Sequence, residues 1–258
     1  MIEKLFVFII GSMIGSFLNV CIYRMPRNES IVTPPSRCPS CKKHISWYDN
    51  IPMLSFLVLR AKCRNCKIKI SPRYFVVELL TAIIILFVYT QYGLSPKLFI
   101  YGVLFCALIV ASFIDLEFQI IPDEISVGSI IVGLLVNAIL PSFNGLANIK
   151  QALIFSGLGI LVGGGTLYLT GIIGDIIFKK ESMGGGDIKL LAGIGAFLGW
   201  QIALLVFFIA PMFGAIMGLA VKIRKKISII PYGPFISLST FIAVFWGQEI
   251  INWVIFRY

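Results

Sequence analysis

The sequence predicts an all-α, polytopic membrane protein with about eight transmembrane helices and one small cytosolic loop module that binds zinc. Hydrophobic residues make up 58% of the 258 residues, whereas a soluble domain is closer to half apolar. Uncharged runs recur along the chain, and about 20 apolar residues cross a bilayer as a helix. These runs lack the alternation of a barrel strand, so helices are the way to satisfy their backbone groups in lipid.

The distribution of basic residues orients the predicted spans. With the first span running from outside to inside, 18 of the 22 Lys and Arg residues fall on the cytosolic side and 4 on the other, which is the positive-inside bias. The net charge of +10 therefore indicates orientation and contact with anionic membrane lipids, and no nucleic-acid binding. Both termini are expected outside, and the spans lie near 3–23, 74–92, 98–115, 125–142, 151–178, 187–199, 201–222 and 232–254.

Three regions follow from this order. The first apolar run, within residues 1–23, is not followed by a small-residue cleavage site, so we expect it to be a retained span. Residues 24–73 form the only sizeable polar segment and are predicted to be a cysteine-rich module. Residues 74–258 are predicted to form the membrane-embedded catalytic domain.

One pair of spans is unusually short. Lys189 and the basic cluster 222–226 are both predicted inside, so the uncharged run between them must cross and return, and "LGWQ" at 198–201 is the expected turn. A first limb over 187–199 is roughly 20 Å long at about 1.5 Å per residue, less than a hydrocarbon core of about 30 Å. A locally thinned bilayer, a polar cavity at the cytosolic end and a re-entrant segment are the alternatives.

Two aspartates are the candidate catalytic residues. Asp115 ends the third predicted span and Asp187 opens the sixth, so both fall at the cytosolic face. Ionisable residues at membrane depth mark functional sites by default. Two facing carboxylates do not readily ionise together. One can then donate a proton to a substrate carbonyl while the other takes a proton from water, which is the chemistry of an aspartic peptidase.

Simple helix capping is the alternative for each aspartate, and it has weight for Asp187 because an acid at a helix N-terminus is favourable. Asp123, before the fourth span, favours a cap more strongly, with a supporting role beside the pair as the other interpretation. The glycines 184–186 precede Asp187 directly. They tolerate positive φ and carry no Cβ, so a substrate backbone could approach Asp187 closely.

Four cysteines predict a metal site. Cys38 and Cys41 form one CxxC pair, and Cys63 and Cys66 form a second after a 21-residue gap, a spacing close to that of four-cysteine zinc sites. The loop is predicted to be cytosolic, where disulfides are disfavoured. We expect a structural zinc ion, which would fold a loop too small for a core of its own. A redox-active CxxC pair is the alternative, and the two remaining cysteines are expected to pack inside apolar spans.

Five motifs together resemble the prepilin peptidase, or type IV leader peptidase, family of GxGD-type intramembrane aspartic peptidases, over almost the whole chain. They are "GSFLNVCIYRMP" (15–26), the cysteine segment 38–79, "DLEFQIIPDEI" (115–125), "GGGDIKLLAGIGAFLGW" (184–200) and "PYGPFI" (231–236). The resemblance places the catalytic pair on Asp115 and Asp187 and the zinc ligands on the four cysteines. Ala61 and Phe75 depart from the usual glycine and proline, and the stretches near 140–150 and 175–183 are longer than usual.

The resemblance also implies a function. Family members reside in the bacterial cytoplasmic membrane and cut the short basic leader of type IV prepilins and pseudopilins after a glycine, at the cytosolic edge of the substrate's hydrophobic N-terminal helix. Many members also N-methylate the new terminus with S-adenosylmethionine, and those members carry the cysteine loop, so the resemblance implies both activities here. No glycine fingerprint after a strand locates the methyl-donor site in this chain.

Two other classes of function compete with the peptidase. A transporter would use Asp115 and Asp187 as ion or proton ligands, but we see no internal repeat or paired broken helices. A membrane thiol oxidoreductase would use the CxxC pairs, but the charge pattern places them inside.

Overall fold

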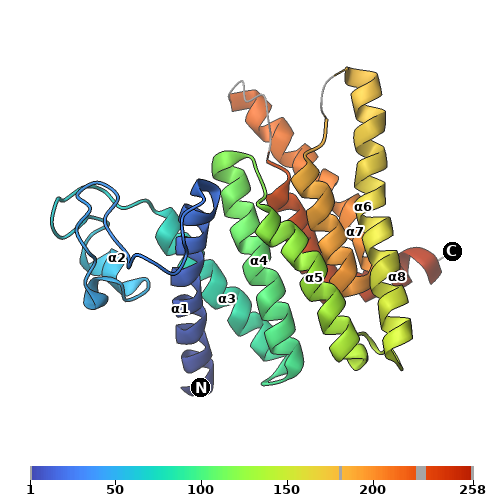
Figure 1. The fold of residues 1–258 in the computed structure, drawn as a ribbon, viewed down its shortest axis with the longest axis horizontal. Coiled ribbons are helices and arrows are strands. Elements are labelled where there is room, and N and C mark those ends of the chain that lie inside the picture. Colours follow the sequence, from blue (N-terminus) through green and yellow to red (C-terminus); the bar gives the residue numbers. More distant parts are fainter. Residues whose placement is uncertain (1, 180–181, 225–230, 257–258) are drawn as a thin grey trace. The chain divides into compact units, whose positions relative to one another are not determined.

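The computed structural model describes residues 2–179, 182–224 and 231–256. Within these ranges the regular structure is helical apart from two isolated bridges, Arg37 with His44 and Lys62 with Lys69, so the all-α prediction is confirmed (Figure 1). Of the predicted cytosolic basic residues, Lys180, Lys225 and Lys226 lie outside the described residues. The α-helices are α1 (Ile2–Arg24), α2 (Leu54–Val58), α3 (Arg73–Tyr92), α4 (Pro96–Phe118), α5 (Asp123–Ile139), α6 (Ile149–Phe178), α7 (Gly185–Arg224) and α8 (Gly233–Phe256).

Six of the described helices are long and apolar enough to span a membrane, namely α1, α3, α4, α6, α7 and α8. The protein is therefore a multi-pass membrane protein. Eight spans were expected, and two features account for the difference. The fourth expected span is α5, which has only 17 residues. The sixth and seventh expected spans are two limbs of α7, which are separated by a break at Gly199.

The chain reverses at Gly199, as the "LGWQ" segment predicted. Gly199 has a φ of 82° inside α7, a left-handed conformation that glycine adopts without steric cost. Contacts with α6 show the reversal. A Cβ built on Gly163 would lie 2.6 Å from the Leu191 carbonyl oxygen and 3.3 Å from the Ala203 Cβ. Residues 12 apart on a straight helix are about 18 Å apart, so the two limbs fold back on each other.

The first limb of α7 is the buried helix of its unit. Every residue from 190 to 199 is buried, and α5, α6 and α7 lie side by side (Figure 1). A Cβ on Gly159 of α6 would lie 1.9 Å from the Gly195 carbonyl oxygen, so only glycine allows this backbone approach. A limb surrounded by protein does not need the length of a lipid-exposed span.

Two asparagines and a serine complete the end of that limb. The last carbonyls of a helix have no partner within it. Here the buried Asn137 amide donates to the carbonyls of Ala196 (2.8 Å) and Phe197 (3.3 Å). Ser156 Oγ also donates to Ala196 at 2.9 Å, and Asn144 donates to Phe197 at 2.9 Å. The reversal therefore takes place without unsatisfied carbonyls at these positions.

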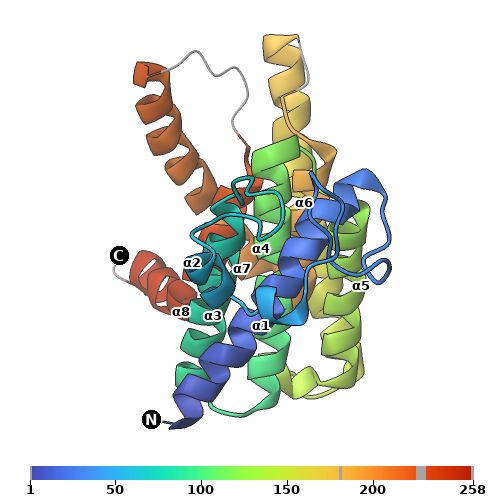
Figure 2. The same ribbon diagram turned by 90° about the vertical axis from the view of Figure 1, so that its left-hand side faces the viewer.

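The chain divides into two compact units, residues 1–110 and residues 111–258. In the first unit α1 packs against α3, and the Asn19 amide of α1 donates to the Tyr74 carbonyl at 3.0 Å. The cysteine loop belongs to this unit and consists mostly of turns around the short helix α2 (Figure 2). Asp115, Asp187 and the whole of α5 to α8 belong to the second unit.

Candidate active site and metal centre

Asp115 lies near the C-terminal end of α4 and is 6% exposed. Its Oδ2 accepts a hydrogen bond from the backbone N–H of Gly233 at 2.7 Å, and the carboxyl group also accepts one from the backbone of Tyr232. Gly233 is the first residue of α8, so this carboxylate satisfies N–H groups that have no partner inside the helix. The contact joins residues far apart in the sequence, and "PYGPFI" was recognised only as a motif without an assigned role.

Asp187 lies in the first turn of α7 and is half-buried. It interacts electrostatically with Asp115, and also with the side chain of Tyr232. Its Oδ1 is buried and has no hydrogen-bond partner among the described residues. The fold therefore brings the two sequence-predicted aspartates into one site, with Tyr232 as a third side chain beside them.

The glycine triplet acts through the absence of side chains. The left-handed glycines of the described chain are Gly93, Gly145 and Gly199, so the triplet does not use the positive φ that the sequence suggested. A Cβ on Gly184 would instead lie 2.9 Å from Asp187 Oδ2, and one on Gly186 would lie 2.9 Å from the Ile121 Cβ. Gly186 thus lets the start of α7 approach the link between α4 and α5.

Asp123 does not hydrogen-bond to the aspartate pair in the described structure. Its Oδ1 accepts a charged hydrogen bond from Lys189 Nζ at 2.7 Å, which joins the first turn of α5 to α7. From the sequence alone, Lys189 indicates only the orientation of the chain. The sequence contains a signal for this ion pair, because Lys189 lies two residues after Asp187 and Asp123 follows Asp115. Since Asp123 and Lys189 are far apart along the chain, the sequence does not show that they meet.

The four loop cysteines converge on one point. Their sulfur atoms all lie within 4.8 Å of one another, and the Cys38 and Cys66 sulfurs are 3.8 Å apart. Four thiolates around a tetrahedral zinc ion, with Zn–S bonds of about 2.3 Å, have S–S distances of about 3.8 Å. The donor set therefore fits a metal ion of this kind. All four are free thiols in the structure.

The two CxxC segments fold alike. Cys38 N–H donates to the Lys43 carbonyl and Lys42 N–H to the Cys38 carbonyl, at 3.0 and 2.9 Å. In the second segment, Cys63 N–H donates to the Ile68 carbonyl and Lys67 N–H donates to the Cys63 carbonyl. Lys42 and Lys67 are both left-handed, with φ of 58° and 59°. Backbone N–H groups of Cys66 and Asn65 lower the pKa of the Cys63 thiol to about 7, whereas burial and the neighbouring thiols raise the pKa of the Cys66 thiol to about 11. Of these two thiols, Cys63 is the one that ionises more readily to the thiolate that a metal requires.

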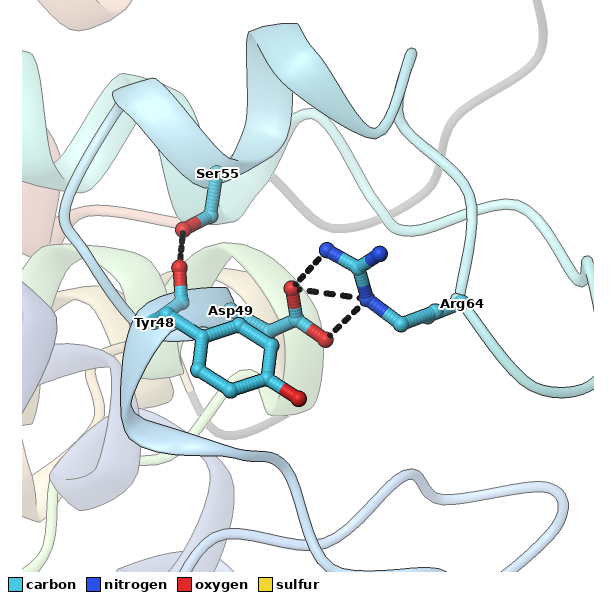
Figure 3. Close-up of polar contacts among 4 residues, drawn as sticks. All are labelled: Tyr48, Asp49, Ser55 and Arg64. Atoms are coloured by element: carbon cyan, nitrogen blue, oxygen red, sulfur yellow. Dashed lines mark hydrogen bonds and ion pairs between the residues drawn. The ribbon is translucent and has the colours of Figure 1, made fainter.

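An ion pair ties the second CxxC segment to the rest of the loop. Arg64 Nη2 donates to Asp49 Oδ1 at 2.6 Å, and Arg64 Nε donates to Asp49 Oδ2 at 2.7 Å (Figure 3). This pairing lowers the pKa of the Asp49 carboxyl. Beside it, Ser55 Oγ donates to the Tyr48 carbonyl at 3.1 Å. The loop is also joined to α3, because the Glu78 carboxylate accepts the Met53 N–H at 2.7 Å.

Fold and site together define a multi-pass helical membrane protein that has a carboxylate pair in one unit and a four-cysteine centre in the other. Comparison with known proteins gives the family. Residues 9–92 match the bacterial peptidase A24 N-terminal domain, and residues 102–219 match the type IV leader peptidase family. The chain belongs to the type IV leader peptidase family, and the resemblance seen in the sequence is confirmed.

Several relatives carry the name prepilin leader peptidase/N-methyltransferase. The protein from Legionella pneumophila is 34% identical over 94% of this chain and 91% of its own length. The protein from Aeromonas hydrophila is 35% identical over 96% and 92%. A Myxococcus xanthus protein is 39% identical over 83% of this chain, which spans only 62% of that longer relative. No solved structure matches the chain.

Proposed function

We propose that this chain cleaves the leader of type IV prepilins or pseudopilins with Asp115 and Asp187, and N-methylates the new terminus. Leader-peptide cleavage and N-methylation follow from the family and from relatives of 32–39% identity that bear both activities in their names. The transporter alternative is not favoured by these relatives. The assignment of the two aspartates rests on one observation, that α4 and α7 bring both carboxyl groups into one site.

The site suits hydrolysis by a general acid and a general base. One carboxylate takes a proton from water while the other, protonated, donates to the carbonyl oxygen of the scissile peptide, so no covalent intermediate is required. The buried Asp187 Oδ1 is a polar atom that a substrate group could pair with. The close approach that Gly184 permits beside Asp187 is compatible with an extended substrate backbone there. Asp123 would support the site by holding Lys189 and thereby the start of α7.

The substrate would enter from the lipid with its hydrophobic N-terminal helix. The positive-inside bias supports a cytosolic position for the cysteine loop and for both aspartates, in the bacterial cytoplasmic membrane. The basic residues would contact anionic lipids, and no nucleic acid is involved. The division into a first span (1–23), a cysteine loop (24–73) and a peptidase domain (74–258) stays a prediction.

Two cofactors belong to this proposal. Cys38, Cys41, Cys63 and Cys66 would hold a zinc ion, whose role would be to stabilise the loop, because four thiolates leave no open coordination position. S-adenosylmethionine would supply the methyl group. We assign no residue to its binding.

The test is the processing of a co-expressed prepilin, followed by mass spectrometry of the product. We expect the Asp115→Ala and Asp187→Ala variants to insert into the membrane normally and to leave the leader uncut. Glu117→Ala, on the same turn of α4 as Asp115, is the matched control and should retain cleavage. Normal processing by either aspartate variant would refute the assignment, and the mass of the wild-type product reports the cleavage position and any added methyl group.

A further inference from the structure

The two aspartates have unequal surroundings. The Asp115 carboxyl group accepts backbone hydrogen bonds from Gly233, at Oδ2, and from Tyr232, at the N-terminus of the 24-residue helix α8. Hydrogen bonds to a carboxylate and the positive end of a helix both favour the ionised form.

In the described structure, the Oδ1 atom of Asp187 accepts no backbone hydrogen bond of this kind. Its Oδ1 is buried without a hydrogen-bond partner among the described residues, and an uncompensated buried carboxylate is costly. The start of α7 favours a charge at this position, but Asp187 also faces the Asp115 carboxylate. Two carboxyl groups that interact this closely lose their protons in sequence. Asp115, which the backbone donors stabilise as a carboxylate, loses its proton first.

The other polar groups around Asp115 and Asp187 do not change which of the two carboxyl groups loses its proton first. From the segment before α8, the Tyr232 hydroxyl faces Asp187 and carries no charge at neutral pH. From α7, Lys189 lies two residues from Asp187, but its ammonium group binds Asp123 of α5 at 2.7 Å. From α8, Ser237 Oγ is hydrogen-bonded to Ser112 of α4 and to the Gly233 carbonyl.

We propose that Tyr232 and Gly233 are positioning residues that hold Asp115 ionised, so that Asp115 is the general base and Asp187 is the general acid. This inference rests on the proposed function. Asp115 takes a proton from water as the water oxygen attacks the carbonyl carbon, and Asp187 gives its proton to the carbonyl oxygen. When the C–N bond breaks, Asp115 returns its proton to the leaving amine, and Asp187 recovers one from the collapsing diol.

The first experiment compares Gly233→Pro with Gly233→Ala. Both add a Cβ, which would lie 3.0 Å from Asp115 Oδ2, but only proline removes the N–H donor. Proline is tolerated at the first position of a helix. The acidic limb of a bell-shaped pH profile of kcat/KM reports the base. We expect this limb to lie about one pH unit higher in Gly233→Pro than in Gly233→Ala, since a hydrogen bond to a charged group is worth about that much.

The alkaline limb, which reports the acid, should coincide in the two variants. A shift of the alkaline limb in place of the acidic one, or identical profiles, would overturn the assignment of roles. That failure differs from failure of the proposed function, in which Asp115→Ala and Asp187→Ala would still process the prepilin.

A second experiment uses the wild-type protein and does not depend on the folding of a variant. An apolar carbodiimide reacts with protonated carboxyl groups, and mass spectrometry of peptides locates the stable acylurea. At neutral pH we expect the label on Asp187, with Asp115 labelled only after acidification, which also shows that the reagent reaches it. Label on Asp115 at neutral pH would overturn the proposal.

Discussion

Single polar side chains decide where this largely apolar chain can turn and react. Asp115 and Asn137 are both nearly inaccessible, and each hydrogen-bonds to the end of a helix from another part of the chain. Asp115 accepts from the N–H groups at the start of α8, whereas Asn137 donates to carbonyls at the end of the first α7 limb. In surroundings that contain little water, such groups replace the hydration that a helix end otherwise has.

Asn137→Ala should destabilise the second unit. The substitution removes the donor to the Ala196 and Phe197 carbonyls, and a buried polar group that loses its partner costs about 1–3 kcal/mol. Ser156 and Asn144 remain as donors, so we expect the lower half of that range, measured as a lower Tm in detergent. Asn252→Ala on α8, where the asparagine is exposed, is the control. An unchanged Tm for Asn137→Ala would contradict this account of the helix end.

At the scale of elements, α7 shows how a hydrophobic run becomes two limbs. Apolar residues continue along the chain on both sides of Gly199, so the hydrophobic pattern does not indicate where the chain turns. The turn depends on a left-handed residue and on close packing with α6. Phe155 of α6 occupies the position that a side chain at 199 would need, because a Cβ there would lie 2.2 Å from the Phe155 ring.

Gly199→Ala should therefore prevent correct folding. Backbone strain in a left-handed non-glycine residue costs about 1–3 kcal/mol, and the overlap with Phe155 adds to it. We expect a large loss of folded protein in detergent, measured by size-exclusion chromatography. Gly165→Ala in α6 is the matched control, because its Cβ would meet nothing within 4 Å and alanine is the better helix former. Equal yields of the two variants would show that the turn tolerates a side chain.

The cysteine loop is the second element with its own prediction. Purified protein should contain about one zinc ion per chain, since four thiolates form one closed tetrahedral site. Cys63→Ser should lower the zinc content measured by mass spectrometry, and Cys21→Ser in α1 should leave it unchanged. Zinc should be lost on acidification, because protons compete for the thiolates. Rapid thiol exchange without bound zinc would favour the redox interpretation.

At the scale of the whole molecule, charge decides how the chain is inserted. The two compact units carry different candidate chemistry, with the cysteine centre in residues 1–110 and the aspartate pair in residues 111–258. The charge pattern predicts the cysteine loop and the aspartates on the same side of the membrane. The basic residues predict that this side is the cytosol.

Labelling with a membrane-impermeant thiol reagent tests this topology. Val32 in the cysteine loop and Leu94 between α3 and α4 are each 81% exposed. In a chain that lacks Cys21 and Cys106, we expect Leu94→Cys to react in intact cells. Val32→Cys should add label, above that of the four loop cysteines, only in inverted vesicles. The reverse pattern would invert the predicted orientation and remove the aspartates from the cytosolic face.

Much of this protein could be read from local features of the chain. Apolar runs specify membrane helices, CxxC spacing specifies the four-thiolate cluster, and the positions of Asp115 and Asp187 at the ends of such runs indicate a site. Each of these signals lies within a single segment. The turn at 198–201 was also predicted, because charge on both sides of one long run requires the chain to return.

The tertiary structure alone decided which groups meet those residues. The pairing of Asp115 with Tyr232 and Gly233, of Lys189 with Asp123, and of Asn137 with the end of the first α7 limb depends on the rotation and depth of packed helices. Hydropathy and spacing do not encode these quantities, because many rotations bury the same apolar area. A polar side chain selects one rotation only when its partner lies at hydrogen-bond distance, and that partner comes from a distant part of the chain.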